Sequence, residues 1–181
     1  LIVVGSHVPT TTRQLNALID ADLAVTTELN VRTVLDAPEG YTDSLAKDIA
    51  AALEKGNVIL HTSRELVKGK DRDDSLRIAR TVSEALVGTV NKVVHTVTPK
   101  FVIAKGGITS SDTASKGLEM TRATVVGPMQ PGIISLWKAE DGPARGIPYI
   151  VFAGNVGNDQ SLVDVVERLS AQLTHKGELS Q

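Results

Sequence analysis

The chain contains no cysteine among its 181 residues. Disulfides, thiolate zinc sites and cysteine nucleophiles are therefore excluded, and the composition fits a reducing compartment, so we expect a cytoplasmic protein. Aromatic residues make up 3% of the sequence, and Trp137 is the single tryptophan. Such a chain lacks the stacking platforms that bind single-stranded nucleic acid.

Excess charge and long apolar runs are missing as well. The 19 Lys and Arg residues against 21 Asp and Glu residues give a net charge of -2, so no global field attracts nucleic acid or an anionic membrane. No apolar run approaches the roughly 18 to 20 residues that span a bilayer. We therefore expect neither nucleic acid nor membrane as a partner, and any anion site must be local.

Short apolar runs alternate with amphipathic stretches, which predicts an α/β fold with three layers, α/β/α, around a mixed, largely parallel sheet. The length suits a single domain, 1–181. The chain opens with Leu1 directly in a buried strand, so we expect a piece of a longer protein. Strands are predicted at 1–5, 23–29, 57–63 and 100–107, and at 123–126, 133–137 and 147–153, where part of the sheet should be antiparallel.

Helices are predicted where apolar residues recur every three or four positions. The first covers 9–23, with Thr10, Thr11 or Thr12 as its cap. Gly56 ends the second, and the longest covers 73–97. A short helix follows at 110–120, and the last is opened by Asp159 or Ser161 and carries an apolar stripe to Leu173. We expect a loop at 36–42 and fraying of the tail, 174–181.

Three strands end in glycine and lead straight into a helix: "VVGSHVPTTTRQ" (3–14), "AKGGITSSDTAS" (104–115) and "FAGNVGNDQSL" (152–162). Such a corner presents unpaired N–H groups at a helix start, where phosphate or carboxylate can bind. If the strands are parallel, the three corners lie along one edge and can converge on one crevice. The alternative is that Gly, Ser and Thr only turn the chain and cap the helices.

The central corner is the richest in candidate ligand groups. Gly106 and Gly107 let the backbone approach a ligand, and hydroxyls follow at Thr109, Ser110 and Ser111. Lys105 is predicted either to place a cation beside a phosphate or to reach solvent from the strand end.

Other polar residues fit no established motif. Asp112 is interpreted as a first-turn acid or as a helper in metal binding, and Asp159 as a cap. The corners match neither a Walker A nor a dinucleotide fingerprint. The four histidines, His7, His61, His95 and His175, lack ligand spacing, so no metal site is predicted. His7 adjoins the first corner, where it either contacts a ligand or is a loop residue without a role.

Four motifs in order, "VVGSHVPTTTRQL", "AKGGITSSDTASKGL", "GPMQPGIISLW" and "VFAGNVGNDQSLVDVVERL", resemble the C-terminal nucleotide-binding domain of the four-carbon acid sugar kinase family. The resemblance extends from residue 1 to about 173. It implies a kinase that uses ATP and Mg²⁺ to phosphorylate erythronate, threonate or a 3-oxo-tetronate at the terminal hydroxyl. It also implies a partner domain, N-terminal in the parent chain, that binds much of the acid sugar.

The resemblance assigns nucleotide contacts to Ser6, to Gly106, Gly107, Ile108 and Thr109 with Ser110 adjacent, and to Gly154. No catalytic base is identified, because the N-terminal half of such a kinase is missing here. The chain departs from the family at Gly132-Ile133-Ile134, a change that we expect an apolar strand to tolerate. The alternative function is a non-catalytic module that senses a nucleotide or another anion, and the oligomeric state is open.

Overall fold

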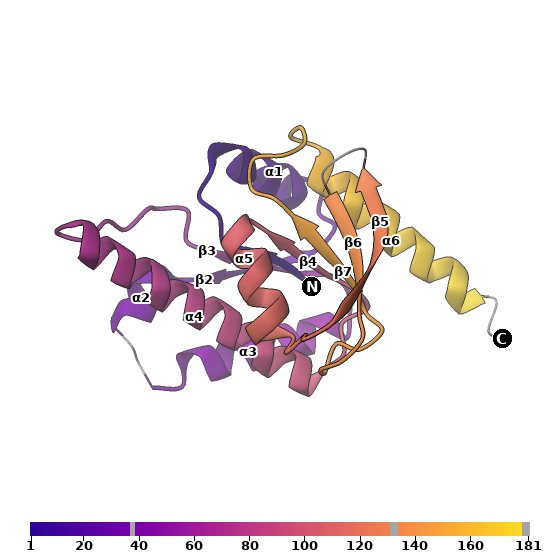
Figure 1. Cartoon of the computed structure of the whole chain (residues 1–181), viewed down its shortest axis with the longest axis horizontal. Helices are drawn as coiled ribbons and strands as arrows, with labels where there is room; N and C mark the ends of the chain where they lie inside the picture. Colours follow the sequence, from indigo (N-terminus) through magenta and orange to yellow (C-terminus); the bar gives the residue numbers. More distant parts are fainter. Residues whose placement is uncertain (37–38, 131–133, 179–181) are drawn as a thin grey trace.

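A seven-stranded sheet forms the centre of the protein (Figure 1). The structure is a computed structural model that describes residues 1–36, 39–130 and 134–178, and the side chains up to residue 171. The strands are β1 (Ile2–Val4), β2 (Val25–Leu29), β3 (Val58–Thr62), β4 (Val102–Lys105), β5 (Ala123–Gln130), β6 (Ile134–Ala139) and β7 (Pro148–Phe152). The helices are α1 (Pro9–Asp20), α2 (Val31–Asp36), α3 (Tyr41–Leu53), α4 (Arg72–Thr96), α5 (Gly107–Asp112), a π-helical turn η1 (Thr113–Gly117) and α6 (Ser161–Glu178).

The strand order is β2-β3-β1-β4-β7-β6-β5. The first five strands in this order are parallel to one another, whereas β6 is antiparallel to both β7 and β5. The predicted mixed, largely parallel sheet is confirmed, with its antiparallel part in the Gly- and Pro-rich region.

Helices cover both faces of this sheet, which confirms the three layers (Figure 1). Strand β1 is apolar throughout because it is covered on both faces: its side chains alternate between the two hydrophobic cores on either side of the sheet. Ile2 and Val4 pack with residues of α1 and α6, whereas Leu1 and Val3 pack with residues of α2, α3 and α4. In the described part of the chain, no helix combines the length and apolarity that crossing a membrane needs.

Helix α1 begins differently from the prediction. Val8 precedes the helix and Pro9 is its first residue, and no described side chain caps it. Proline suits this position because its missing N–H would have no partner there. Capping by Thr10, Thr11 or Thr12 is therefore wrong, and Thr11 instead donates to the Gly154 carbonyl at 2.8 Å.

Other boundaries shift as well. Helix α2 was not predicted, although Asn30 marks its start: the Asn30 side chain accepts from the Thr33 N–H at 3.0 Å. Helix α5 begins at Gly107, before the predicted start, and α6 continues to Glu178 in the tail that was expected to fray. Positions 37–38 of the predicted loop, Gly132 and Ile133, the Leu173 side chain and residues 179–181 lie outside the described residues.

Tyr149 on β7 links the sheet to α5, and we expect Tyr149→Phe to lower the free energy of unfolding by about 1–2 kcal/mol. The side chain is 1% exposed and its hydroxyl donates to the Ser110 carbonyl at 2.6 Å. Urea denaturation measures the loss. Tyr41→Phe is the matched control, since that hydroxyl accepts a single exposed bond from the Asn30 N–H. Equal losses in the two variants would contradict a special role for the Tyr149 bond.

Candidate functional site

The three glycine corners lie side by side at the carboxyl edge of the sheet. Strand β4 pairs with β1 and β7, and the register sets Lys105 beside Val4 on one side and Phe152 on the other. The Gly106 N–H donates to the Phe152 carbonyl at 2.8 Å, which extends the pairing by one residue. The prediction that the three corners lie along one edge is confirmed.

Ser6 is the residue at which the three corners touch. A Cβ added to Gly106 would lie 2.9 Å from Ser6 Cβ, and one added to Gly154 would lie 2.9 Å from Ser6 Oγ. Gly106 also has φ +122°, which disfavours any residue with a side chain. Ser6 thus lies against both Gly106 and Gly154, which is possible because neither glycine has a side chain.

A pocket of about 490 Å³ opens beside the first and central corners. Backbone and hydroxyl groups form its polar edge, contributed by Gly5, Ser6, Gly106, Gly107 and Thr109. Apolar side chains line much of the rest, contributed by Val31, Leu66, Val67, Ile78, Ala79, Val82 and Leu86, and the polar residues His7, Thr62, Lys68, Ser75 and Ser83 lie among them. Apolar walls with a few convergent polar groups are typical of small-molecule sites.

The central corner presents backbone N–H groups to this pocket. Within the described residues, no side chain caps α5, whose first turn is closed by the Ser110 N–H donating to the Gly106 carbonyl at 2.8 Å. A Cβ on Gly107 would meet no described atom within 4 Å, so the backbone there faces open space. Ile108 is 75% exposed at the rim. The arrangement can receive an anion against bare backbone.

Two predicted contacts point away from the pocket. Ser110 Oγ donates to the Ala104 carbonyl at 2.7 Å, so this hydroxyl supports β4. Lys105 is 0% exposed, and its Nζ donates to the Ala153 carbonyl at 2.6 Å and the Gly154 carbonyl at 3.3 Å. The interpretation of Lys105 as a lysine that reaches solvent is therefore wrong. Burial lowers the pKa of its ammonium to about 7.

The acidic candidates have structural partners. Asp112 ends α5 and does not begin it; its carboxylate accepts from Ser83 Oγ at 3.1 Å and pairs with Lys116 at 3.4 Å. Asp159 pairs with Arg13 at 2.9 Å and lies two residues before the start of α6 at Ser161, so its interpretation as a cap is also wrong. Among the described residues, no three His, Cys, Asp or Glu side chains group as metal ligands.

His7 lines the pocket, and its Nε2 lies 3.0 Å from the Ser63 carbonyl. That contact fixes the ring at the end of β1, beside Ser6. The structure therefore places His7 where one of its two interpretations requires it.

Sequence reasoning missed the connection between β3 and α4, which was interpreted only as charged. Leu66 and Val67 from this segment form pocket wall. Arg64 donates through Nη2 to the Ser6 carbonyl at 2.8 Å and to Thr12 Oγ1 at 2.6 Å, and so holds the first corner from behind. The sequence signal that could have identified this pocket wall is the apolar pair Leu66 and Val67 within an otherwise charged stretch.

Comparison with known proteins agrees with this geometry. The family described as "Nucleotide-binding C-terminal domain" matches residues 1–162. No curated protein matches the chain significantly.

Solved structures share the fold. A Bordetella bronchiseptica protein with a domain of unknown function (DUF1537), a domain-swapped dimer with bound citrate, aligns with a TM-score of 0.75 and 21% identity over 93% of this chain and 40% of its own. Haemophilus influenzae protein HI1011 aligns with a TM-score of 0.66 and 20% identity, over 94% of this chain and 39% of its own. A putative tRNA synthase from Salmonella typhimurium aligns with a TM-score of 0.64 and 18% identity, over 90% of this chain and 39% of its own.

The chain thus spans about two fifths of the length of these proteins. At this level of identity they support the fold, and the family match supplies the functional class. The chain belongs to the family of nucleotide-binding C-terminal domains.

Proposed function

We propose that this chain is the ATP-binding lobe of a kinase that phosphorylates a four-carbon acid sugar, such as erythronate, threonate or a 3-oxo-tetronate, at its terminal hydroxyl. The observation that carries the proposal is a pocket with apolar walls whose polar edge is formed by the first and central glycine corners, while the third corner lies against Ser6. A nucleotide has the same division of chemistry, with an anionic chain attached to a flat apolar base.

The phosphates would lie at the polar edge. Ser6 and Thr109 offer hydroxyls, while Gly106, Gly107 and Ile108 offer backbone N–H groups at the start of α5. Gly154, which lies against Ser6, would add a contact from the third corner. The base would occupy the slot between α4 and the segment that carries Leu66 and Val67.

Phosphoryl transfer depends mainly on positioning and charge stabilisation, which backbone donors can supply around the donor phosphates. Mg²⁺ enters the proposal only as the counter-ion of ATP, since the described side chains form no metal-binding group. The acceptor and the catalytic base would come from a domain N-terminal to this chain. ATP-dependent sugar-acid metabolism would place the reaction in the cytoplasm.

A thermal-shift experiment tests nucleotide binding. MgATP at about 100 times its dissociation constant should stabilise the chain by roughly 2.7 kcal/mol, which corresponds to a rise in Tm of about 5–10 °C for a domain of this size. Adenosine and inorganic phosphate at equal concentration serve as partial ligands. No stabilisation by any nucleotide would contradict the proposal and leave the corners as helix caps only.

A coupled assay tests the division of labour between domains. The 181 residues alone should not phosphorylate erythronate or threonate, whereas the longer parent chain should. Turnover by these residues alone would contradict the assignment of the acceptor site to another domain. A parent chain that binds MgATP without turnover would contradict the kinase and favour a nucleotide-sensing module.

A further inference from the structure

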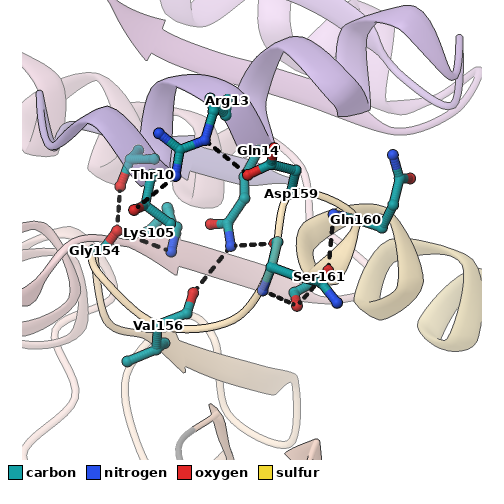
Figure 2. Close-up of polar contacts among 11 residues, drawn as sticks. Thr10, Arg13, Gln14, Lys105, Gly154, Val156, Asp159, Gln160 and Ser161 are labelled. Atoms are coloured by element: carbon teal, nitrogen blue, oxygen red, sulfur yellow. Dashed lines mark hydrogen bonds and ion pairs between the residues drawn. The ribbon is translucent and has the colours of Figure 1, made fainter.

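The loop between β7 and α6, residues 153–160, is fixed through its carbonyl groups. Lys105 donates to the carbonyls of Ala153 and Gly154, and Thr11 Oγ1 donates to the same Gly154 carbonyl at 2.8 Å. Figure 2 shows Lys105 and α1 converging on Gly154 from one side of the loop. Three donor contacts from two separate elements thus hold two consecutive peptide units.

The same pattern continues along the loop. Gln14 is fully buried, and its Nε2 donates to the carbonyls of Val156 at 2.9 Å and Asn158 at 2.7 Å. The ion pair between Arg13 and Asp159 lies at the far end (Figure 2). Helix α1 therefore binds the loop along its length, through Thr11, Gln14 and Arg13.

These contacts determine where the loop directs its N–H groups. In a planar trans peptide, the carbonyl and the following N–H point in opposite directions. The N–H groups of Gly154, Asn155 and Gly157 must then point away from Lys105 and α1. Among the described residues, none of these three groups donates a hydrogen bond. Gly157 adopts φ +80°, and successive outward N–H groups in such a turn form an anion-binding concavity.

Lys105 itself is poorly placed to contact a ligand. It has no exposed surface, does not line the pocket, and its Nζ lies 3.9 Å from the centre of the Phe152 ring. Two carbonyl oxygens and an aromatic face therefore surround the ammonium and compensate part of its burial. The lowered pKa reflects the part that is not compensated.

We propose that Lys105 is a positioning residue: it binds the carbonyls of Ala153 and Gly154 from behind and thereby turns the N–H groups of Gly154 and Asn155 toward the phosphates. The inference rests on the proposed function for the identity of the anion. In this role the Lys105 ammonium acts through the loop and does not contact the nucleotide itself.

The test compares Lys105→Met with the wild-type chain. Methionine keeps most of the apolar stem and removes the donor. NMR order parameters of residues 153–157 should fall from about 0.85 to below about 0.6 without any ligand. The affinity for MgATP and for inorganic tripolyphosphate should fall about tenfold, or 1.4 kcal/mol. Adenosine, which has no phosphate, should bind unchanged, and this separates positioning of the loop from general damage to the domain.

Lys92→Met is the matched control, because Lys92 also donates a hydrogen bond, to Thr42 Oγ1, but lies on α4 and pairs with Asp43 at 2.7 Å. It should leave all three affinities unchanged. If Lys105→Met does not fold, Thr11→Val removes the neighbouring donor to Gly154 with nearly equal volume. That variant should weaken tripolyphosphate binding about threefold and spare adenosine.

The outcomes separate the two proposals. An unchanged loop in Lys105→Met, or equal losses for adenosine and MgATP, would overturn the positioning role. Failure of the wild-type chain to bind either MgATP or tripolyphosphate would overturn the proposed function instead. The order parameters would still decide whether Lys105 fixes the loop.

Discussion

Gly107→Val is expected to weaken MgATP binding roughly 100-fold, or about 2.7 kcal/mol, while the fold persists. A Cβ added at Gly107 meets no described atom within 4 Å, so the new side chain begins in open space. From there it extends into the space where the proposed phosphates approach α5. Valine also tolerates a helical position better than glycine, so the free energy of unfolding should not fall.

Isothermal titration calorimetry with MgATP measures the effect, and urea denaturation of the same sample verifies the fold. Gly56→Val is the matched control, because a Cβ there also meets no described atom within 4 Å and Gly56 does not line the pocket. Equal MgATP affinity in Gly107→Val and the wild-type chain would place the phosphates elsewhere.

The part of the sheet edge that carries the three corners could be predicted from the sequence, because each of its three strands is an apolar run that stops at or near a glycine. β1, β4 and β7 stop at Gly5, Gly106 and Gly154 or within two residues of them. Neighbouring parallel strands then bring their ends together, whatever the loops contain. The sequence could not predict which strands are neighbours, since strand order depends on how α1 and α4 cross the sheet.

The directions of polar side chains could not be predicted in the same way. A lysine at a strand end fits both a solvent position and a buried one, and the choice depends on the loop 153–160 folding over it. Asp112 shows the same limit. It was predicted in the first turn of the helix, but α5 begins at Gly107, so the carboxylate lies at the end of the helix. Local pattern fixes where the backbone turns, whereas tertiary packing decides which hydroxyls, carboxylates and ammonium groups face the ligand.

The pocket wall illustrates a further difference. Val82 and Leu86 belong to the helical stripe that predicted the core, and they do pack in it. Near the N-terminal half of α4, however, the same face also borders the pocket, where Leu66 and Val67 face it from the β3–α4 segment. A helix stripe therefore marks burial without distinguishing contact with the core from contact with a ligand.

Gly5→Ala is expected to lower the free energy of unfolding by about 3 kcal/mol, the upper end of the cost of overpacking. The new Cβ would lie 2.4 Å from Thr109 Oγ1 and 3.0 Å from Leu86 Cδ2. Both neighbours are buried, so neither can move away freely. The first corner would then push against the central corner, and urea denaturation would record the loss.

A double-mutant cycle with Thr109→Ala identifies the source of that loss. Removing the threonine hydroxyl and methyl frees the space that the new Cβ needs, so the double variant should be more stable than the sum of the single effects by about 1–2 kcal/mol. Additive losses would mean that the strain lies at Leu86 or in the backbone. Ser110→Ala with Gly5→Ala is the control, because Ser110 contacts Ala104 and not Gly5. Coupling confined to Thr109 would show that the first and central corners are in direct contact.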